Sequence, residues 1–92
     1  REANSAGLDY LEEQFKILGL QSFPAHGNFI MVNVSRPAED VFNGLLRRGI
    51  IVRGGHMLGF PTSLRVTIGS SEQNAKFIAA LTEVLAEVPV QA

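Results

Sequence analysis

The sequence predicts an α+β fold in which a small sheet of about three strands packs against helices. Three segments of this 92-residue chain repeat apolar residues at the three- and four-residue spacing of an amphipathic helix. Three shorter segments are rich in β-branched residues, which favour strands. The segments follow one another as helix, strand, helix, strand, strand, helix, without an internal repeat or a low-complexity linker. A sheet covered by helices is the arrangement that buries all these apolar faces.

The first predicted helix covers roughly residues 4–18. Its apolar side chains recur at intervals of three and four residues and therefore share one face: they are Leu8, Leu11, Phe15 and Leu18. Gly19 then supplies the left-handed residue that commonly ends a helix. The next stretch, residues 21–27 around Pro24, predicts a turn.

The middle of the chain predicts a strand and a second helix. Residues 29–34 are nearly continuous in apolar and β-branched side chains and too short for a buried helix, so they predict a strand inside the sheet. Ser35 and Pro37 predict an N-cap and a proline in the first turn of a helix. This helix covers residues 37–48 and ends at Gly49. Its apolar stripe consists of Val41, Phe42, Leu45 and Leu46.

The second half of the chain predicts two short strands and a last helix. Residues 50–53 are β-rich, and residues 54–61 contain three glycines and a proline, which predict a loop. Residues 64–68 alternate apolar and polar side chains, the pattern of a strand with one buried face. Ser70 and Gln73 have the spacing of a capping box. The helix that follows has these apolar residues: Phe77, Ile78, Leu81, Val84 and Leu85.

Composition and charge exclude several classes of function. The formal net charge is −1 and the charged residues are scattered, so the chain offers no electrostatic footprint for nucleic acid or an anionic membrane. Cysteine is absent, which excludes disulfides and thiolate metal sites and favours the cytoplasm. No apolar run approaches the roughly 20 residues that a membrane-spanning helix requires. We therefore expect a soluble globular chain.

Residues 1–92 are expected to form a single domain, because a chain of this length can build one compact core and not a second. The first residue is Arg1 and not methionine, and no basic and apolar leader follows it. The simplest interpretation is a piece of a longer polypeptide.

Two arginines flank the glycine-rich loop and are the candidate binding residues. Arg53 ends one predicted strand, and Arg65 begins the next. Guanidinium groups bind carboxylates and phosphates through two parallel hydrogen bonds and remain charged when partly desolvated. The spacing predicts an anion site, although ordinary surface arginines at strand edges would show the same spacing. Since the apolar residues of its strand take one face, Arg65 lies with Thr67 on the other.

The histidines and lysines offer no catalytic group. Neither His26 nor His56 has a second histidine, a cysteine or a carboxylate at metal-ligand spacing, so both are interpreted as loop residues. Lys16 and Lys76 fall among the polar residues of amphipathic helices, where a solvated lysine is the simpler interpretation than a Schiff-base lysine. We therefore predict no metal site and no catalytic residue in this chain.

Several short segments are shared with a known family. They are residues 27–30 (G-N-F-I), 49–53 (G-I-I-V-R), 59–61 (G-F-P), 64–69 (L-R-V-T-I-G) and 72–74 (E-Q-N). These segments resemble the C-terminal region of histidinol-phosphate aminotransferases, over a stretch from about Leu8 to Leu85. The resemblance implies the C-terminal small domain of a fold-type I pyridoxal-phosphate enzyme, with a mostly antiparallel sheet.

The resemblance also implies a reaction and roles for the two arginines. The family moves an amino group between histidinol phosphate and 2-oxoglutarate in histidine biosynthesis. Arg65 would pair with the substrate α-carboxylate, and Arg53 with the substrate phosphate or the distal carboxylate of the other substrate. Pyridoxal 5′-phosphate and the lysine that binds it would belong to the large domain of the same polypeptide. This piece alone is therefore expected to be inactive, to bind no cofactor, and to form a homodimer through the surface that normally faces the large domain.

Two alternatives remain open. The small domain of a sister aminotransferase or of a phospho-amino-acid decarboxylase would show the same features. A free-standing α+β module that binds a small anionic metabolite as a regulatory domain would also fit the alternation of helices and strands. The length of the parent reading frame separates the two classes, since a large domain with a cofactor lysine requires several hundred residues.

Overall fold

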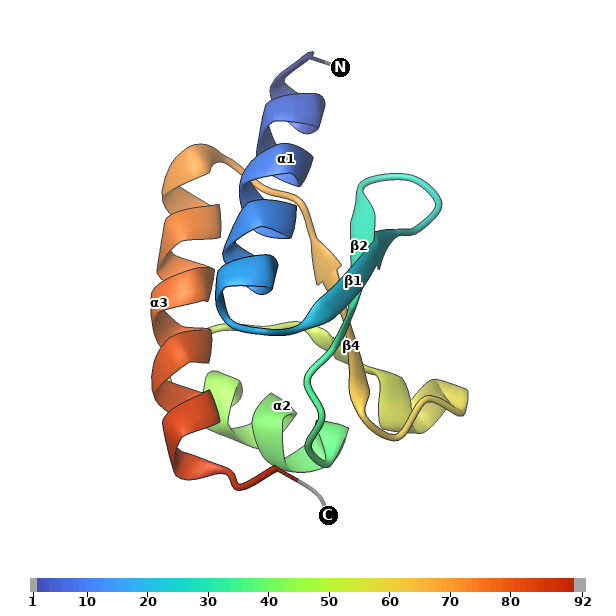
Figure 1. The fold of residues 1–92 in the computed structure, drawn as a ribbon, viewed down its shortest axis with the longest axis vertical. Helices are drawn as coiled ribbons and strands as arrows, with labels where there is room; N and C mark the ends of the chain where they lie inside the picture. The colour runs from blue at the N-terminus through green and yellow to red at the C-terminus, as the bar shows by residue number, and fades with distance from the viewer. Residues whose placement is uncertain (1, 91–92) are drawn as a thin grey trace.

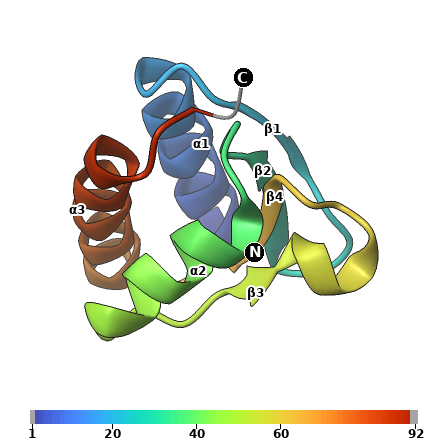
Figure 2. The same cartoon turned by 90° about the horizontal axis from the view of Figure 1, so that it is seen from below.

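Within residues 2–90, which the computed structural model describes, three α-helices cover one face of a four-stranded sheet (Figure 1). The elements are α1 (Glu2–Ile17), β1 (Gln21–Pro24), β2 (Phe29–Asn33), α2 (Ala38–Arg47), β3 (Arg53–Gly54), the 3₁₀ helix η1 (Gly55–Leu58), β4 (Ser63–Thr67) and α3 (Ser71–Glu87). Figure 2 shows α1, α2 and α3 on the same side of the strands. The predicted α+β fold is confirmed. In this part of the chain, no helix is both long and apolar enough to cross a membrane.

The strands pair in the order β1-β2-β4-β3, and every pair is antiparallel. The expected antiparallel pairing and the interior position of β2 are confirmed. The sheet has four strands where about three were predicted, because Gln21–Pro24 forms β1; the prediction of a turn at these residues was wrong. Since β1 is an edge strand, it pairs with β2 alone, and Pro24 at its end can be accommodated without breaking a central ladder.

The strand predicted over residues 50–53 is shorter than expected. Only Arg53 and the following Gly54 pair with β4. Ile50 and Val52 pack instead against the core, whereas Ile51 is 79% exposed. A hollow of ≈ 390 Å³ lies between this segment, the end of β4 and the start of α3. Packing of the partly buried Ile50 and Val52 against the core therefore takes the place of strand pairing here.

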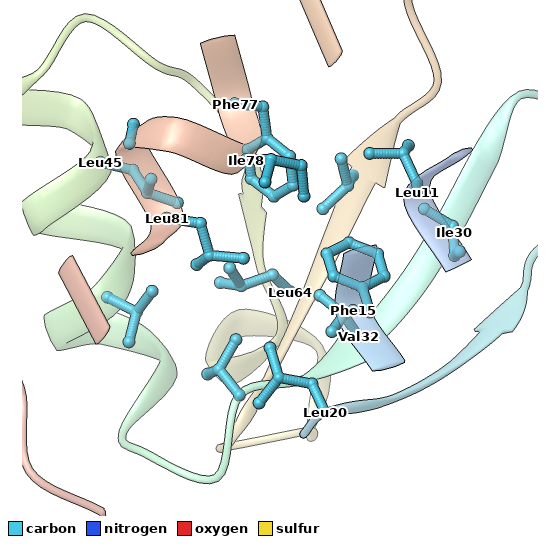
Figure 3. Close-up of a cluster of buried hydrophobic side chains, with 14 of the residues drawn as sticks. Leu11, Phe15, Leu20, Ile30, Val32, Leu45, Leu64, Phe77, Ile78 and Leu81 are labelled. Atoms are coloured by element: carbon cyan, nitrogen blue, oxygen red, sulfur yellow. The ribbon is translucent and has the colours of Figure 1, made fainter. Parts of the chain in front are cut away.

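The core lies between the sheet and the helices (Figure 3). Leu11 and Phe15 of α1 are fully buried, as the helical spacing predicted. The ring of Phe15 packs edge-on against Phe77 of α3, with 6.1 Å between centroids. Seven further members of the cluster are labelled around them: Leu20, Ile30, Val32, Leu45, Leu64, Ile78 and Leu81. Each buried side chain of this size contributes roughly 1.5–3 kcal/mol relative to its exposed state, so this cluster is the main source of stability.

The start of α2 differs from the prediction. The helix begins at Ala38, Pro37 is its N-cap, and no side chain caps it. Ser35, the expected N-cap, has a φ of 57° and donates its N–H to Oδ1 of Asn33 at 2.9 Å. The N–H of Ala38 donates to the carbonyl oxygen of Pro61 at 2.7 Å. A contact with a distant loop therefore replaces the local cap.

Two arginines connect α3 to the rest of the fold. Arg36 donates to three carbonyl oxygens at 2.8, 3.2 and 2.7 Å: those of Val34, Leu85 and Val88. Arg48 pairs with two carboxylates of α3 at 2.9 and 2.7 Å: those of Glu83 and Glu87. The hydrogen bond to Glu83 is the main reason why the pKa of Arg48 is raised above its ordinary value. Both guanidinium groups are thus engaged within the protein.

The start of α3 matches the prediction. Oγ of Ser70 accepts from the N–H of Gln73 at 3.1 Å, and Oε1 of Gln73 accepts from the N–H of Ser70 at 2.9 Å, which completes the capping box. Next to it lies Asn74, which is 3% exposed. Its side chain accepts from the N–H of Gly69 at 2.9 Å and donates to the carbonyl oxygen of Gly69 at 3.2 Å. Asn74 therefore satisfies the backbone where the chain passes from β4 to α3.

Asn74→Ala is expected to lower the free energy of unfolding by about 2–4 kcal/mol, because both backbone groups of Gly69 lose their partner. Urea unfolding of the parent and the variant measures the difference. Asn43→Ala is the matched control, since Asn43 is exposed on α2 and the change brings the same gain in helix propensity. A loss at Asn74 no larger than that at Asn43 would show that the buried amide does not hold this junction.

Candidate functional site

Arg53 and Arg65, the residues predicted to form an anion site, lie directly opposite each other. Arg53 is the first residue of β3, and its register partner is Arg65 in the middle of β4. Since Leu64 and Val66 on either side of Arg65 are buried, the alternation along the strand places Arg65 on the face away from the helices. Side chains directly opposite in an antiparallel pair have Cβ atoms about 4.5–5.5 Å apart. The structure therefore brings the two predicted residues together.

The row that contains both arginines extends across the whole sheet. Met31 of β2 is the register partner of Arg65, and Phe23 of β1 is the partner of Met31. We term Phe23, Met31, Arg65 and Arg53 the outer row, because they share the face without α-helices that Figure 2 shows. This row is apolar toward β1 and cationic toward β3. Phe23 is 59% exposed at the apolar end.

The two guanidinium groups of the outer row have no carboxylate partner among the described residues. The ion pairs found there join Arg48 to α3 and Lys76 to Glu72. Nε of Arg65 is buried and, within residues 2–90, has no hydrogen-bond partner. Like charges directly opposite in a sheet are destabilising, and a buried unsatisfied donor costs about 1–3 kcal/mol. A bound anion would offset the repulsion between the two like charges.

Phe29 contributes to the same face, although the sequence analysis did not identify it. It is the register partner of Thr67 and therefore lies diagonally across from Arg65. The guanidinium carbon of Arg65 lies 4.1 Å from the centroid of the Phe29 ring, within the range of a cation–π interaction. The period of two along β2 places Phe29 on the same face as Met31. Its contact with Arg65, however, depends on the pairing register, which the sequence pattern alone does not provide.

The loop between the two arginines is closely packed. It contains η1, and the N–H of Phe60 donates to the carbonyl oxygen of Gly55 at 2.8 Å. A Cβ at Gly55 would collide with the carbonyl oxygens of Ser63 and Phe60, so a glycine is required here. Gly59 ends η1 with a φ of 88°. Because the loop is closed in this way, β3 is held beside β4. Arg53 therefore stays opposite Arg65 in the sheet.

The histidines and lysines show no arrangement for covalent or metal chemistry. Lys16 is exposed in the last turn of α1, and the side chain of Lys76 on α3 is 72% exposed. Neither lies in the desolvated pocket that activates a Schiff-base lysine. His56 of η1 packs edge-on against Phe42, with 6.1 Å between ring centroids. Among the described residues, no group of three or more potential ligands could hold a metal ion.

The chain is similar to curated aminotransferases over most of its length. The family model for aminotransferase class I and II matches residues 2–81. The histidinol-phosphate aminotransferase of Moorella thermoacetica is 52% identical over 86 residues, which are 94% of this chain and 22% of that protein. The protein of the same name from Bacillus subtilis strain 168 is 48% identical over 84 residues, 91% of this chain and 23% of that protein. The chain thus spans less than a quarter of the length of these relatives.

Solved aminotransferases contain the same fold. A mutant of the aspartate aminotransferase of Thermus thermophilus superposes with a TM-score of 0.80 and 24% identity, over 91% of this chain and 24% of that one. The histidinol-phosphate aminotransferase of Clostridium acetobutylicum gives 0.74 and 22% identity, over 90% of this chain and 26% of that one. Structural similarity at sequence identities of 24% and 22% establishes the fold alone. With the family match over residues 2–81, it follows that the chain belongs to the aminotransferase class I and II family.

Proposed function

We propose that residues 1–92 are the C-terminal small domain of a histidinol-phosphate aminotransferase, which moves an amino group between histidinol phosphate and 2-oxoglutarate in histidine biosynthesis. The observation that carries this proposal is the pair formed by Arg53 and Arg65, which are opposite in register and lack a carboxylate partner among the described residues. The names of relatives at 48–52% identity support the choice of substrates. Both substrates carry anionic groups that match a guanidinium pair.

The two arginines divide the binding of the substrates. Arg65 binds the α-carboxylate of the amino-acid substrate. Arg53 binds the phosphate of histidinol phosphate or the distal carboxylate of the other substrate. Each guanidinium can hold its anion through two parallel hydrogen bonds, which fix orientation as well as position. Their contribution is therefore to orient the substrate for reaction, and they move no proton.

The cofactor of this reaction is assigned to another part of the polypeptide. Aminotransferases of this family depend on pyridoxal 5′-phosphate, which supplies the electron sink for the reaction when it is bound. Lys16 and Lys76 are unsuited to form the covalent bond to pyridoxal 5′-phosphate, because both side chains are exposed on helices. We therefore assign the cofactor lysine to a large domain, and this chain alone is inactive under the proposal.

The helix-free face of the sheet is the surface assigned to contact with the large domain. Phe23 and Phe60 are 59% and 54% exposed and line a hollow of ≈ 750 Å³ at the β1 edge of this face, where Glu12 and Lys16 of α1 also contribute to its lining. Exposed apolar side chains gathered over a polar-rimmed hollow are typical of an interaction surface. In the isolated chain, the same surface is proposed to form a homodimer.

Arg65→Ala in the full-length aminotransferase is expected to lower kcat/KM for glutamate by an amount equivalent to about 2–5 kcal/mol, because a partly buried charged contact is lost. Arg65→Lys should recover only part of this loss, since lysine keeps the charge without the two-pronged geometry. Steady-state kinetics of both variants measure the effect. A near-normal kcat/KM in Arg65→Ala would make the residue an ordinary surface arginine.

Arg53→Ala in the same enzyme is expected to act selectively, with a larger loss of kcat/KM for histidinol phosphate than for histidinol, which lacks the phosphate. The reason is that only the phosphate loses a charge-assisted contact. Arg47→Ala is the matched control, because Arg47 is exposed in the last turn of α2 and lies outside the outer row. Equal losses on the two substrates in Arg53→Ala would remove its role in phosphate binding.

A further inference from the structure

The guanidinium of Arg65 is held by an aromatic ring and not by a carboxylate in the described part of the chain. Its carbon lies 4.1 Å from the centroid of the Phe29 ring. The ion pairs of the described residues involve other cations, Arg48 and Lys76. Phe29 is therefore the contact that defines the direction of the Arg65 side chain.

The backbone of Phe29 is itself fixed on two sides. Its carbonyl oxygen accepts from the N–H of Ala25 at 2.9 Å, which closes the loop between β1 and β2. The carbonyl oxygen of the preceding Asn28 accepts from the N–H of Ile68 at 2.7 Å, which ties the same point to the end of β4. The ring thus projects from a backbone held by both neighbouring strands, one of which carries Arg65.

Contact with an aromatic ring leaves the arginine available to a ligand in a way that an ion pair does not. The five N–H donors of a guanidinium point outward within its plane, so a ring over its face uses none of them. A carboxylate at the same place would also orient the group, but it would occupy donors and neutralise the charge. An aromatic support therefore orients Arg65 while preserving its affinity for an anion.

We propose that Phe29 is a positioning residue for Arg65, and that its ring presents the guanidinium edge to the anionic group of the substrate. This inference rests on the proposed function, because it assigns to Phe29 the orientation of an arginine that binds substrate. It makes the Phe29–Arg65 pair, and not Arg65 alone, the unit that recognises the anion. Phe29 touches no reacting atom and acts through Arg65.

The test uses the full-length holoenzyme and, as the probe, glutarate, a dicarboxylate that has no amino or oxo group and cannot be transaminated, with the dissociation constant measured by calorimetry. Phe29→Leu is expected to raise this constant by about 3- to 30-fold, which is about 0.6–2 kcal/mol at 1.4 kcal/mol per tenfold. The KM for glutamate should rise in parallel, with little change in kcat. Phe29→Tyr should restore values near those of the parent, because the tyrosine ring also attracts a cation.

A series of fluorinated phenylalanines at position 29 separates the cation–π contact from simple packing. Fluorine withdraws electron density from the ring face while nearly preserving ring shape, so the dissociation constant for glutarate should rise with each added fluorine. The same substitutions at Phe42, which is also half-buried but lies on α2, are the control and should leave the dissociation constant unchanged. Because the shape is kept, this series remains decisive even if Phe29→Leu fails to fold.

The outcomes distinguish this inference from the function on which it rests. If Arg65→Ala weakens glutarate binding but fluorination at Phe29 has no effect, the positioning role is overturned and the binding role of Arg65 stands. If Arg65→Ala leaves the dissociation constant for glutarate unchanged, the role of Arg65 in carboxylate binding is itself overturned. A fluorine-dependent rise at Phe29, together with a loss in Arg65→Ala, supports both.

Discussion

The pairing register of β4 is the constraint on which both the fold and the candidate site depend. β4 is paired on both sides, with β2 and with β3, and its side chains alternate between the core and the outer face. Leu64 and Val66 enter the core, and Arg65 between them faces outward. A slip by one residue would exchange these faces, exposing two core residues and burying a guanidinium without a partner. The energy that stabilises the core therefore also fixes the direction of Arg65.

The arginines of this chain fall into two groups by what surrounds them. Arg36 and Arg48 use their donors on backbone carbonyls and glutamates, and they hold α3 in place. Arg53 and Arg65 lie opposite each other without such partners among the described residues, and one ring supports Arg65. A residue used for stability has its donors satisfied within the fold. The pair of like charges left without such partners is instead the basis on which we propose that Arg53 and Arg65 bind anionic groups of a substrate.

Sequence reasoning succeeded where a pattern is local and failed where a contact is distant. The alternation of residues 64–68 was sufficient to place Arg65 opposite the core face, and the spacing of Ser70 and Gln73 gave the capping box. β1 was missed because an edge strand with polar residues and Pro24 resembles a turn until its partner is known. The contact of Phe29 with Arg65 and the pairing of Arg53 with Arg65 both depend on register, which no local pattern encodes.

The claim that Arg53 and Arg65 bind the anionic groups of the substrates can be examined most directly in crystal structures of the full-length aminotransferase, one with histidinol phosphate bound and one with glutamate bound. They should show the phosphate oxygens of histidinol phosphate within about 2.7–3.2 Å of guanidinium nitrogens of Arg53, and the α-carboxylate oxygens of glutamate within the same distance of those of Arg65. Both should also show Arg65 still stacked on Phe29. A ligand bound elsewhere, with either arginine paired to a carboxylate of the enzyme itself, would contradict the claim.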